Sequence, residues 1–468
     1  MAAWVDVQLW RYVIQPGEGW DQALWDDGHW DSGYPTPDQE WTSIVCDVRG
    51  LDFTRGSQSV SVAGGTEAGV LLMELDNRDG QWSQFLDLGD GHFEPALSSG
   101  VQVRVIAGTD TAGQVTLFRG WVEGWVQQWT KTDDVVKVTA VDGWSDLVQQ
   151  GSDVEWTPGA MNEDVASRLW RLVRMRAGWD EDQYPIYLQQ GHVRLLGSSV
   201  WNATERGLTL RRTSVADEVL RTTRSDGGVA FLDGDGSFVY LNRTRWSAVG
   251  AAPSLEVGRA ARPAQAVVPL FGDWCGVPQS NELPYTDLEW LYDGTGAANL
   301  VVVANATAPQ MRDDAGNAIP VAWTQAGSTQ IASRASNRRR QVLQLADLRF
   351  TTQAEADALA QHYLNVYAEK FIAVRRLEIR PELDDRLWDA VLGLRLQDHV
   401  RVLRRTSTNV IDMECLIEGT RYRITPDPTA VDSLGRHYGV WVVTLNTSDA
   451  VNELSSSGVR SKLLEAVA

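Results

Sequence analysis

Few side chains in this sequence have the types and spacing that metal or covalent chemistry requires. The histidines are scattered, and no two of them have the spacing of a zinc-binding helix. They are His29, His92, His192, His362, His399 and His437. The sequence also has no Gly-x-Ser-x-Gly elbow, no phosphate-binding loop and no dinucleotide fingerprint. We therefore expect a protein that is not an enzyme and that has no catalytic residues, no bound metal and no cofactor.

Carboxylate side chains offer two further possibilities for chemistry. Asp384-Asp385 is the kind of pair that a glycosidase uses, yet such pairs are common in any acidic chain. Asp233 and Asp235 imitate the start of a calcium-binding loop, which needs a glutamate at its twelfth position. That position is Thr244, so we predict a hairpin turn instead.

A tryptophan–aspartate pair repeats every five residues near the N-terminus. The aromatic residues of this segment are Trp20, Trp25, Trp30 and Tyr34. Indole rings are enriched at protein interfaces because they offer a large apolar face and one donor. The segment could contact a neighbouring subunit, stack on the sugar rings of a cell surface, or pack on itself. We take its four aromatic residues as candidate interface residues.

The sequence has one basic cluster, formed by Arg334 and the run Arg338, Arg339 and Arg340. Such a cluster could contact DNA or a partner protein. A surface turn that forms salt bridges with acidic neighbours fits better in a chain with so many carboxylates. The three consecutive arginines complete the candidate interface residues.

Composition excludes several classes of protein. The chain has 468 residues, of which 43% are hydrophobic and 22% charged, as is typical of globular domains. Its net charge of −20 repels phosphate, so specific binding to nucleic acid or to an anionic membrane is not expected. An acidic surface would suit a conduit through which DNA passes without sticking, although solubility alone also explains it. No signal peptide and no membrane-spanning apolar run are predicted.

The cysteines indicate the compartment in which the chain is made. Cys46, Cys275 and Cys415 are far apart, and each lies in an apolar stretch. We therefore predict buried free thiols rather than disulfides or metal ligands, and synthesis in a reducing cytoplasm.

Periodicity predicts a mainly β fold with α+β insertions and several domains. Residues 1–150 alternate in strand-length runs with Asp-Gly corners at Asp79-Gly80 and Asp142-Gly143, interrupted by a Trp/Asp-rich insertion at 16–40. This pattern is typical of β-sandwiches and of small β-barrels, and we predict an N-terminal β-barrel.

The rest of the chain divides into four further parts. Residues 151–250 predict an α+β domain, residues 251–345 an irregular β-rich insertion, residues 346–450 a helix and a second β-barrel, and residues 451–468 a tail.

Local sequence signals in these parts predict the positions of three helices and one hairpin. One helix is predicted around Val165, Leu169, Leu172 and Val173, with Asn162 as its cap and Gly178 at its end. Another begins at Ser214 with Asp217 in a capping box, and leads into a hairpin of strands 229–232 and 238–241. A third helix follows the capping pair Thr352 and Glu355.

Motifs at both ends of the chain resemble those of minor tail proteins, or tail-tip hub proteins, of siphophages that infect actinobacteria. The N-terminal motifs are Trp41, Asp47-Val48, Arg55-Gly56, Leu75 to Gly80, and Gly120. The C-terminal motifs are Ala354 to Tyr367, Leu396 to Val402, Ile417 to Gly419, and Trp441 to Leu445. They occur in the family's order and cover about half of the chain at its two ends.

The resemblance implies a structural role in a phage virion. It implies that three chains form a six-barrel ring that ends the tail tube, anchors other tip proteins and gates the DNA channel. The implied partners are a distal tail protein, the tape measure protein and other minor tail proteins, and DNA passes without specific binding. The protein would be assembled in the host cytoplasm. The alternatives are a glycan-binding receptor-recognition protein and a polysaccharide-cleaving tail enzyme.

Overall fold

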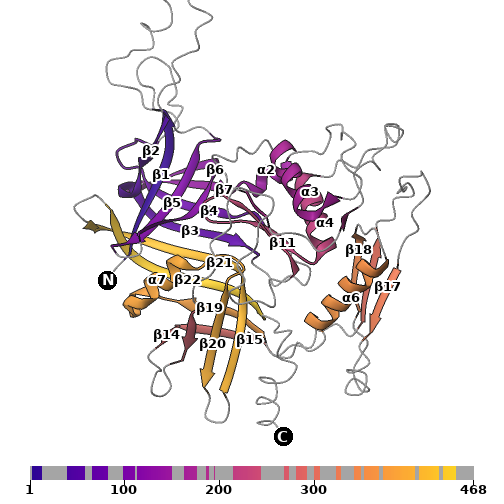
Figure 1. Ribbon diagram of the computed structural model, residues 1–468. Coiled ribbons are helices and arrows are strands. Elements are labelled where there is room, and N and C mark those ends of the chain that lie inside the picture. Colours follow the sequence, from indigo (N-terminus) through magenta and orange to yellow (C-terminus); the bar gives the residue numbers. More distant parts are fainter. Residues whose placement is uncertain are drawn as a thin grey trace, which may run out of the picture. The chain divides into compact units, whose positions relative to one another are not determined.

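The computed structural model shows a mainly β protein, which confirms the predicted fold class (Figure 1). The residues that it describes are 3–12, 39–57, 66–82, 99–110, 113–149, 163–176, 186–188, 194–195, 214–243, 268–273, 281–291, 300–305, 323–327, 342–348, 353–367, 373–405, 410–431 and 436–449. Among these residues, no helix has both the length and the apolar character needed to span a membrane.

The chain forms two compact units, and each is built from separate stretches of sequence. Unit 1 consists of Met1–Phe53, Val70–Asp142 and Tyr422–Val442. Unit 2 consists of Thr54–Gly69, Gly143–Arg421 and Val443–Ala468. The N-terminal unit therefore includes a hairpin from near the C-terminus.

Unit 1 contains a closed, antiparallel, eight-stranded β-barrel. Its strands pair in the order β3, β4, β7, β6, β5, β1, β22 and β21, and β21 pairs with β3 to close the circle. Their bounds are β1 Trp4–Tyr12, β3 Val48–Gly56, β4 Val70–Asp76, β5 Gln102–Thr109, β6 Gly113–Trp129, β7 Asp134–Val141, β21 Val410–Val431 and β22 His437–Asp449. A short strand, β2 (Gln39–Ser43), pairs with β1 beside the barrel.

Inward-facing and outward-facing side chains alternate along the strands of the barrel wall. On β4, Leu71, Met73 and Leu75 are buried, whereas Leu72 and Glu74 are exposed. This alternation is expected for a strand with one face in the core. Inside the barrel, Val5, Val7 and Leu9 of β1 are fully buried. Burial of such side chains supplies the main driving force for folding.

Unit 2 contains a second circuit of strands. Its order is β14, β13, β20, β21, β22, β19 and β15, with the parts of β21 and β22 that belong to this unit. The bounds of the new strands are β13 Leu270–Gly272, β14 Glu282–Pro284, β15 Asp287–Leu291, β19 Ala373–Ile379 and β20 His399–Arg405. Because β14 and β15 stand at opposite ends of this order and are joined by two residues, the chain itself links the two ends.

The predicted helices and hairpin of the middle region are confirmed in unit 2. Helix α3 (Val165–Arg171) and the π-helical turn Leu172–Arg176 bury all four predicted apolar residues, although Asp164 caps the helix. Asn162 and Gly178 lie outside the described residues. Helix α4 (Val215–Asp226) has the predicted capping box, and β11 (Val229–Leu232) and β12 (Phe238–Leu241) form the predicted hairpin.

Two further groups of elements complete unit 2. Helix α6 (Gln353–Tyr367) packs on β16 (Leu300–Asn305), β17 (Trp323–Gly327) and β18 (Val342–Leu348) around a shared apolar core. The remaining short elements are α2 Trp144–Gln149, β8 Glu163–Asp164, β9 Ile186–Leu188, β10 Arg194–Leu195, a 3-10 turn at Pro381–Leu383 and α7 Asp385–Gly393.

The cysteine prediction is half right. Cys415 is a buried free thiol, but Cys46 is exposed. Cys46 lies in a single 3-10 turn, Val45–Asp47, whose buried position is taken by Val45. Cys275 lies outside the described residues.

Candidate functional site

The candidate interface residues of the sequence analysis all lie outside the described residues and stay predictions. They are Trp20, Trp25, Trp30, Tyr34, Arg338, Arg339 and Arg340. Other described residues have the properties of a contact surface. The first group is a cluster of charged side chains at one end of the unit 1 barrel.

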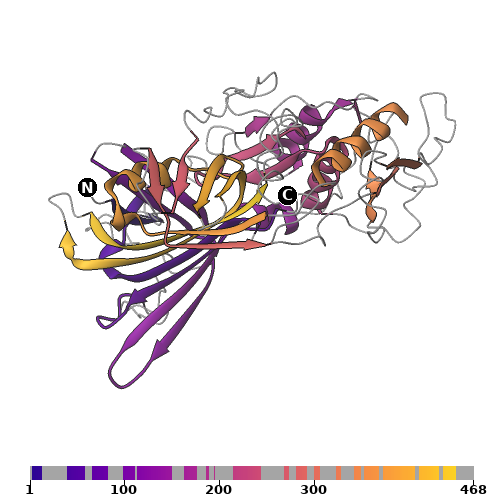
Figure 2. The ribbon, with the colours of Figure 1, turned by 90° about the horizontal axis from the view of Figure 1, so that it is seen from below.

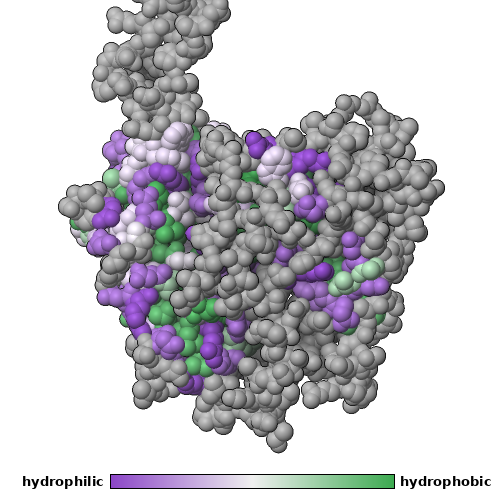
Figure 3. All heavy atoms as spheres, in the orientation of Figure 1, coloured by the Kyte–Doolittle hydropathy of each residue, from purple (hydrophilic) through white to green (hydrophobic). Residues whose placement is uncertain are grey.

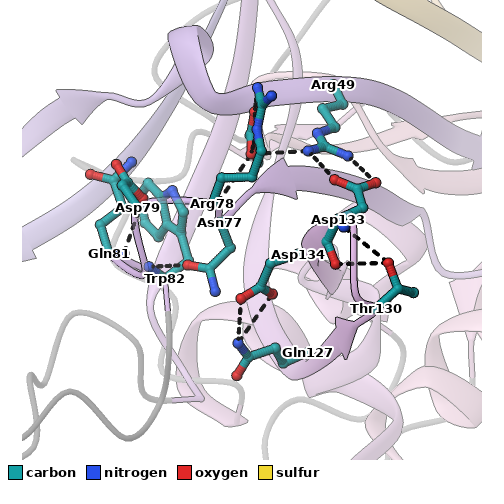
Figure 4. Close-up of polar contacts among 11 residues, drawn as sticks. Arg49, Asn77, Arg78, Asp79, Gln81, Trp82, Gln127, Thr130, Asp133 and Asp134 are labelled. Atoms are coloured by element: carbon teal, nitrogen blue, oxygen red, sulfur yellow. Dashed lines mark hydrogen bonds and ion pairs between the residues drawn. The ribbon is translucent and has the colours of Figure 1, made fainter.

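This cluster, here called the rim cluster, consists of Arg49, Asp76, Arg78, Asp133 and Asp134. Figure 4 shows the polar contacts in this region. Arg49 lies near the start of β3, Asp76 ends β4, and the two other aspartates lie at and just before the start of β7. Three strand ends therefore bring together charges that are far apart in sequence.

A tight turn after β4 holds part of the rim cluster in place. Asn77 is fully buried; its backbone N–H donates to the Asp134 carbonyl at 3.0 Å, and its side-chain oxygen accepts from the Trp82 N–H at 2.7 Å. Gly80 has a φ of 80°, a conformation that favours glycine. The Asp79-Gly80 corner is thus the predicted turn, and it displays the exposed Arg78 beside the barrel end.

Ion pairs connect the strands of the rim. The Arg49 guanidinium donates to both oxygens of Asp133, at 2.7 and 2.6 Å, and to Asp76 at 3.0 Å. Arg78 Nε lies 2.9 Å from each oxygen of the same Asp76. Such forked contacts are stronger and more directional than single charge pairs.

These contacts shift the titration of the carboxylates. Hydrogen bonds from Arg78, opposed by partial burial, hold the pKa of Asp76 well below its usual range. The hydrogen bond from Arg49 lowers the pKa of Asp133, and the bond to Asp133 raises the pKa of Arg49 in turn. Arg49, Asp76, Arg78 and Asp133 are therefore charged and paired at neutral pH.

Replacing Arg49 with methionine is expected to remove a contribution to stability that depends on pH. Since Asp76 and Asp133 have lowered pKa values when folded, that contribution is complete above about pH 4, where unfolded aspartate is ionised. It is lost as the pH falls through the folded-state values. Urea denaturation should thus show that the free energy of unfolding of Arg49→Met is lower than that of wild type. We expect this difference to be constant above about pH 5 and to narrow below pH 4.

The matched control is Lys137→Met, because Lys137 pairs with Glu74 at 3.5 Å on the same barrel and both side chains are about half exposed. Exposed pairs contribute little to stability, so its gap from wild type should be small at every pH. A gap for Arg49→Met that is unchanged at the acid end would contradict the assignment of these carboxylates.

The hairpin of β6 and β7 adds an exposed surface next to the rim cluster (Figure 2). β5 begins opposite Trp121, so residues 123–129 of β6 have β7 as their only strand neighbour among the described residues. Residues 126–132 are all exposed, with Val126 at 58% and Trp129 at 75%. Figure 3 shows that the described part of the face seen in Figure 1 carries both apolar and hydrophilic residues. An open strand edge with an exposed tryptophan is typical of a surface that another protein covers.

Three of the sequence motifs meet at a junction in unit 2. The Ser57 N–H, next to Arg55-Gly56, donates to the Glu418 carbonyl at 2.9 Å. The Gln397 N–H donates to the Ile417 carbonyl at 2.7 Å, and its side chain donates to Glu418 at 2.7 Å. Ser57 and Glu418, which are 361 positions apart, thus join where β3 pairs with β21. A Cβ added at Gly56 would lie 2.4 Å from the Glu418 carbonyl oxygen, which explains why glycine occurs in that motif.

The carboxylates that suggested chemistry have structural partners. Asp384 caps α7 and binds Arg386, whose hydrogen bond lowers the pKa of the Asp384 carboxyl. Asp233 lies in the predicted hairpin turn, 3.6 Å from Arg55 and 3.7 Å from Arg395. Within the described part of the chain, no group of three His, Cys, Asp or Glu side chains could hold a metal ion.

No protein-family model and no curated protein matches this chain. Among solved structures, the tail protein from Neisseria meningitidis MC58 superposes with a TM-score of 0.52 over 96% of this chain and 97% of that chain, at 10% sequence identity. This chain has the fold of that tail protein. The 43 kDa tail protein of prophage MuSo2 from Shewanella oneidensis gives a TM-score of 0.49, with 12% identity over 95% of this chain and 98% of that chain. Prophage tail protein gp18 from Listeria monocytogenes EGD-e gives 0.44, with 9% identity over 99% of both chains.

The tail-protein fold accounts for the whole chain and not for one domain of it. Nearly all of both chains superpose in the comparison with the Neisseria tail protein.

Proposed function

We propose that this chain is a structural phage-tail protein with no enzymatic role, a hub-like minor tail protein that forms a ring at the end of the tail tube. The observation that carries the proposal is the fold shared with the Neisseria tail protein over 96% of this chain. The motifs at both ends favour the tail tip of a siphophage of actinobacteria as the place in the virion, with assembly in the host cytoplasm.

In the proposed assembly, three chains form the ring and each contributes two barrels. The closed barrel of unit 1 and the strand circuit of unit 2 support two barrel-like parts per chain. A closed ring would also cover strand edges that a single copy leaves open. The net charge of −20 supports passage of DNA through the ring without specific binding.

The proposed partners are the distal tail protein, the tape measure protein and other minor tail proteins. The rim cluster and the open edge of β6 are the surfaces that we assign to such contacts. Their support is physical, since the buried Asn77 is hydrogen-bonded through its backbone and its side chain in the turn after β4, and Trp129 is exposed at 75%. Rigid elements with exposed aromatic side chains give specific contacts at low entropic cost.

Native mass spectrometry of the full chain tests the proposal, together with negative-stain electron microscopy. We expect a trimer whose population rises with concentration and whose images show a central opening. A distal tail protein from the same genome should add to this trimer in a fixed ratio. A chain that stays monomeric at every concentration, both alone and with that partner, would refute the hub assignment.

A further inference from the structure

The outer face of the unit 1 barrel has a patch of arginine and tryptophan, here called the arginine–tryptophan face. It consists of Trp10 on β1, Trp41 on β2, Arg104 on β5 and Arg119 on β6. Strand register creates it, because Trp10 lies opposite Trp41 and Arg104 lies opposite Arg119. Four separate strands thus place two cations and two indole rings together.

Both guanidinium groups lie within cation–π distance of the Trp41 ring. The Arg104 guanidinium carbon lies 4.1 Å from the centroid of the Trp41 ring, and that of Arg119 lies 5.8 Å from it. Trp10 meets Trp41 edge to face at 5.2 Å between centroids. Cation–π contacts of this kind orient the guanidinium plane and leave its edge available for hydrogen bonds.

The positive charge of Arg104 is not balanced by an ion pair among the described residues. Its Nε donates to the neutral side chain of Gln8 at 2.8 Å. The nearby carboxylate of Asp6 instead accepts from Gln8 and from Ser43, each at 2.5 Å. Partial burial, followed by the charge of Arg119, lowers the pKa of Arg104, and the charge of Asp6 opposes these two effects in part.

This arrangement costs stability in the isolated chain. Like charges directly opposite each other on neighbouring strands repel, and partial burial adds to the cost. A glutamine or threonine at position 104 would cover the same surface without repulsion. Two arginines next to indole rings are suited to bind a ligand that carries carboxylates. Such a pair of positive charges is notable in a chain with a net charge of −20.

We propose that the arginine–tryptophan face binds residues 18–31 of a second copy of this chain. That segment has five carboxylates, no lysine and no arginine, and its carboxylates are Glu18, Asp21, Asp26, Asp27 and Asp31. Its tryptophans recur every five residues, so each carboxylate–indole pair offers both a partner for guanidinium and a ring for the arginine–tryptophan face. The inference rests on the proposed assembly of several copies and names one contact within it.

The test uses a dye-labelled peptide of residues 18–31 and the full-length protein, with binding followed by fluorescence anisotropy. We expect salt-sensitive binding to wild type, and an affinity lower by on the order of tenfold for Arg104→Gln. Arg104→Lys, which keeps the charge but not the fork, should lie between the two. Lys137→Gln, which changes an exposed cation elsewhere on the barrel, should bind like wild type.

Native mass spectrometry of the same variants separates this inference from the proposed function. A lower trimer fraction for Arg104→Gln, with a melting temperature that is equal to or higher than that of wild type, supports the contact between copies. Rings that form equally with Arg104→Gln, together with no peptide binding, overturn the inference and leave the ring intact. A peptide that binds only after residues 18–31 are deleted from a monomeric protein shows that the segment occupies its own chain, which also overturns it.

Discussion

Replacing Phe53 with alanine is expected to destabilise the unit 1 barrel by about 3–5 kcal/mol, as measured by urea unfolding followed through circular dichroism. Phe53 is fully buried on β3. Its ring stacks on Tyr422 of β21 at 4.9 Å and tilts against Phe118 of β6 at 5.9 Å between centroids. Because these rings come from different parts of the barrel wall, truncation leaves a cavity that the closed barrel cannot collapse to fill.

Two variants give this prediction its controls. Phe53→Leu keeps most of the side-chain volume, so it should lower the free energy of unfolding by less than about 1.5 kcal/mol. Leu72→Ala removes a side chain that is 52% exposed on the neighbouring β4, and its effect should be within about 0.5 kcal/mol. Equal losses for Phe53→Ala and Leu72→Ala would show that Phe53 is not part of a tightly packed core.

Local signals made much of the fold predictable. The Ser214 capping box, the hairpin through Asp235-Gly236 and the alternation along β4 all depend on residues within a few positions of one another. Such signals act before any tertiary contact forms, since capping and turn chemistry are properties of the local backbone. They also identified the Asp79-Gly80 turn that supports the rim cluster.

Contacts between distant residues set the limit of sequence reasoning. Arg49 pairs with Asp133, 84 positions away, and the pattern of hydrophobic residues in the sequence does not predict such a partner. The length of β21, from Val410 to Val431, lets one strand supply both units, so the N-terminal barrel contains residues from near the C-terminus. The sequence signals do not predict helix α7, because Asp384-Asp385 has the form of an ordinary acidic pair. In the structure these residues are the cap and the first residue of the helix.

The residues of the arginine–tryptophan face could not be identified from the sequence. In this face, the Arg104 guanidinium lies over the Trp41 ring. Only strand register puts these two residues together, as Arg104 lies on β5 and Trp41 on β2. Trp41 was singled out as a motif residue, and its role as a shelf for guanidinium required the structure.

Replacing Gly419 with alanine is expected to destabilise unit 2 by about 3 kcal/mol, because an added Cβ would overlap the backbone of a neighbouring strand. That atom would lie 2.1 Å from the Ser57 carbonyl oxygen and 3.2 Å from the Arg55 carbonyl oxygen. Backbone atoms cannot turn away as a side chain can, so β3 and β21 would have to separate at the motif junction. Thermal unfolding followed by circular dichroism measures the loss.

Gly50→Ala is the matched control, since Gly50 lies on β3, the strand that Gly419 of β21 approaches, and an added Cβ there meets nothing within 4 Å. Its effect should be neutral or slightly stabilising, because alanine restricts the unfolded chain more than glycine does. Equal melting temperatures for the two variants would contradict the close strand approach. A loss confined to Gly419→Ala would instead explain why glycine occurs in the Ile417 to Gly419 motif, since at that position the strands leave no room for a side chain.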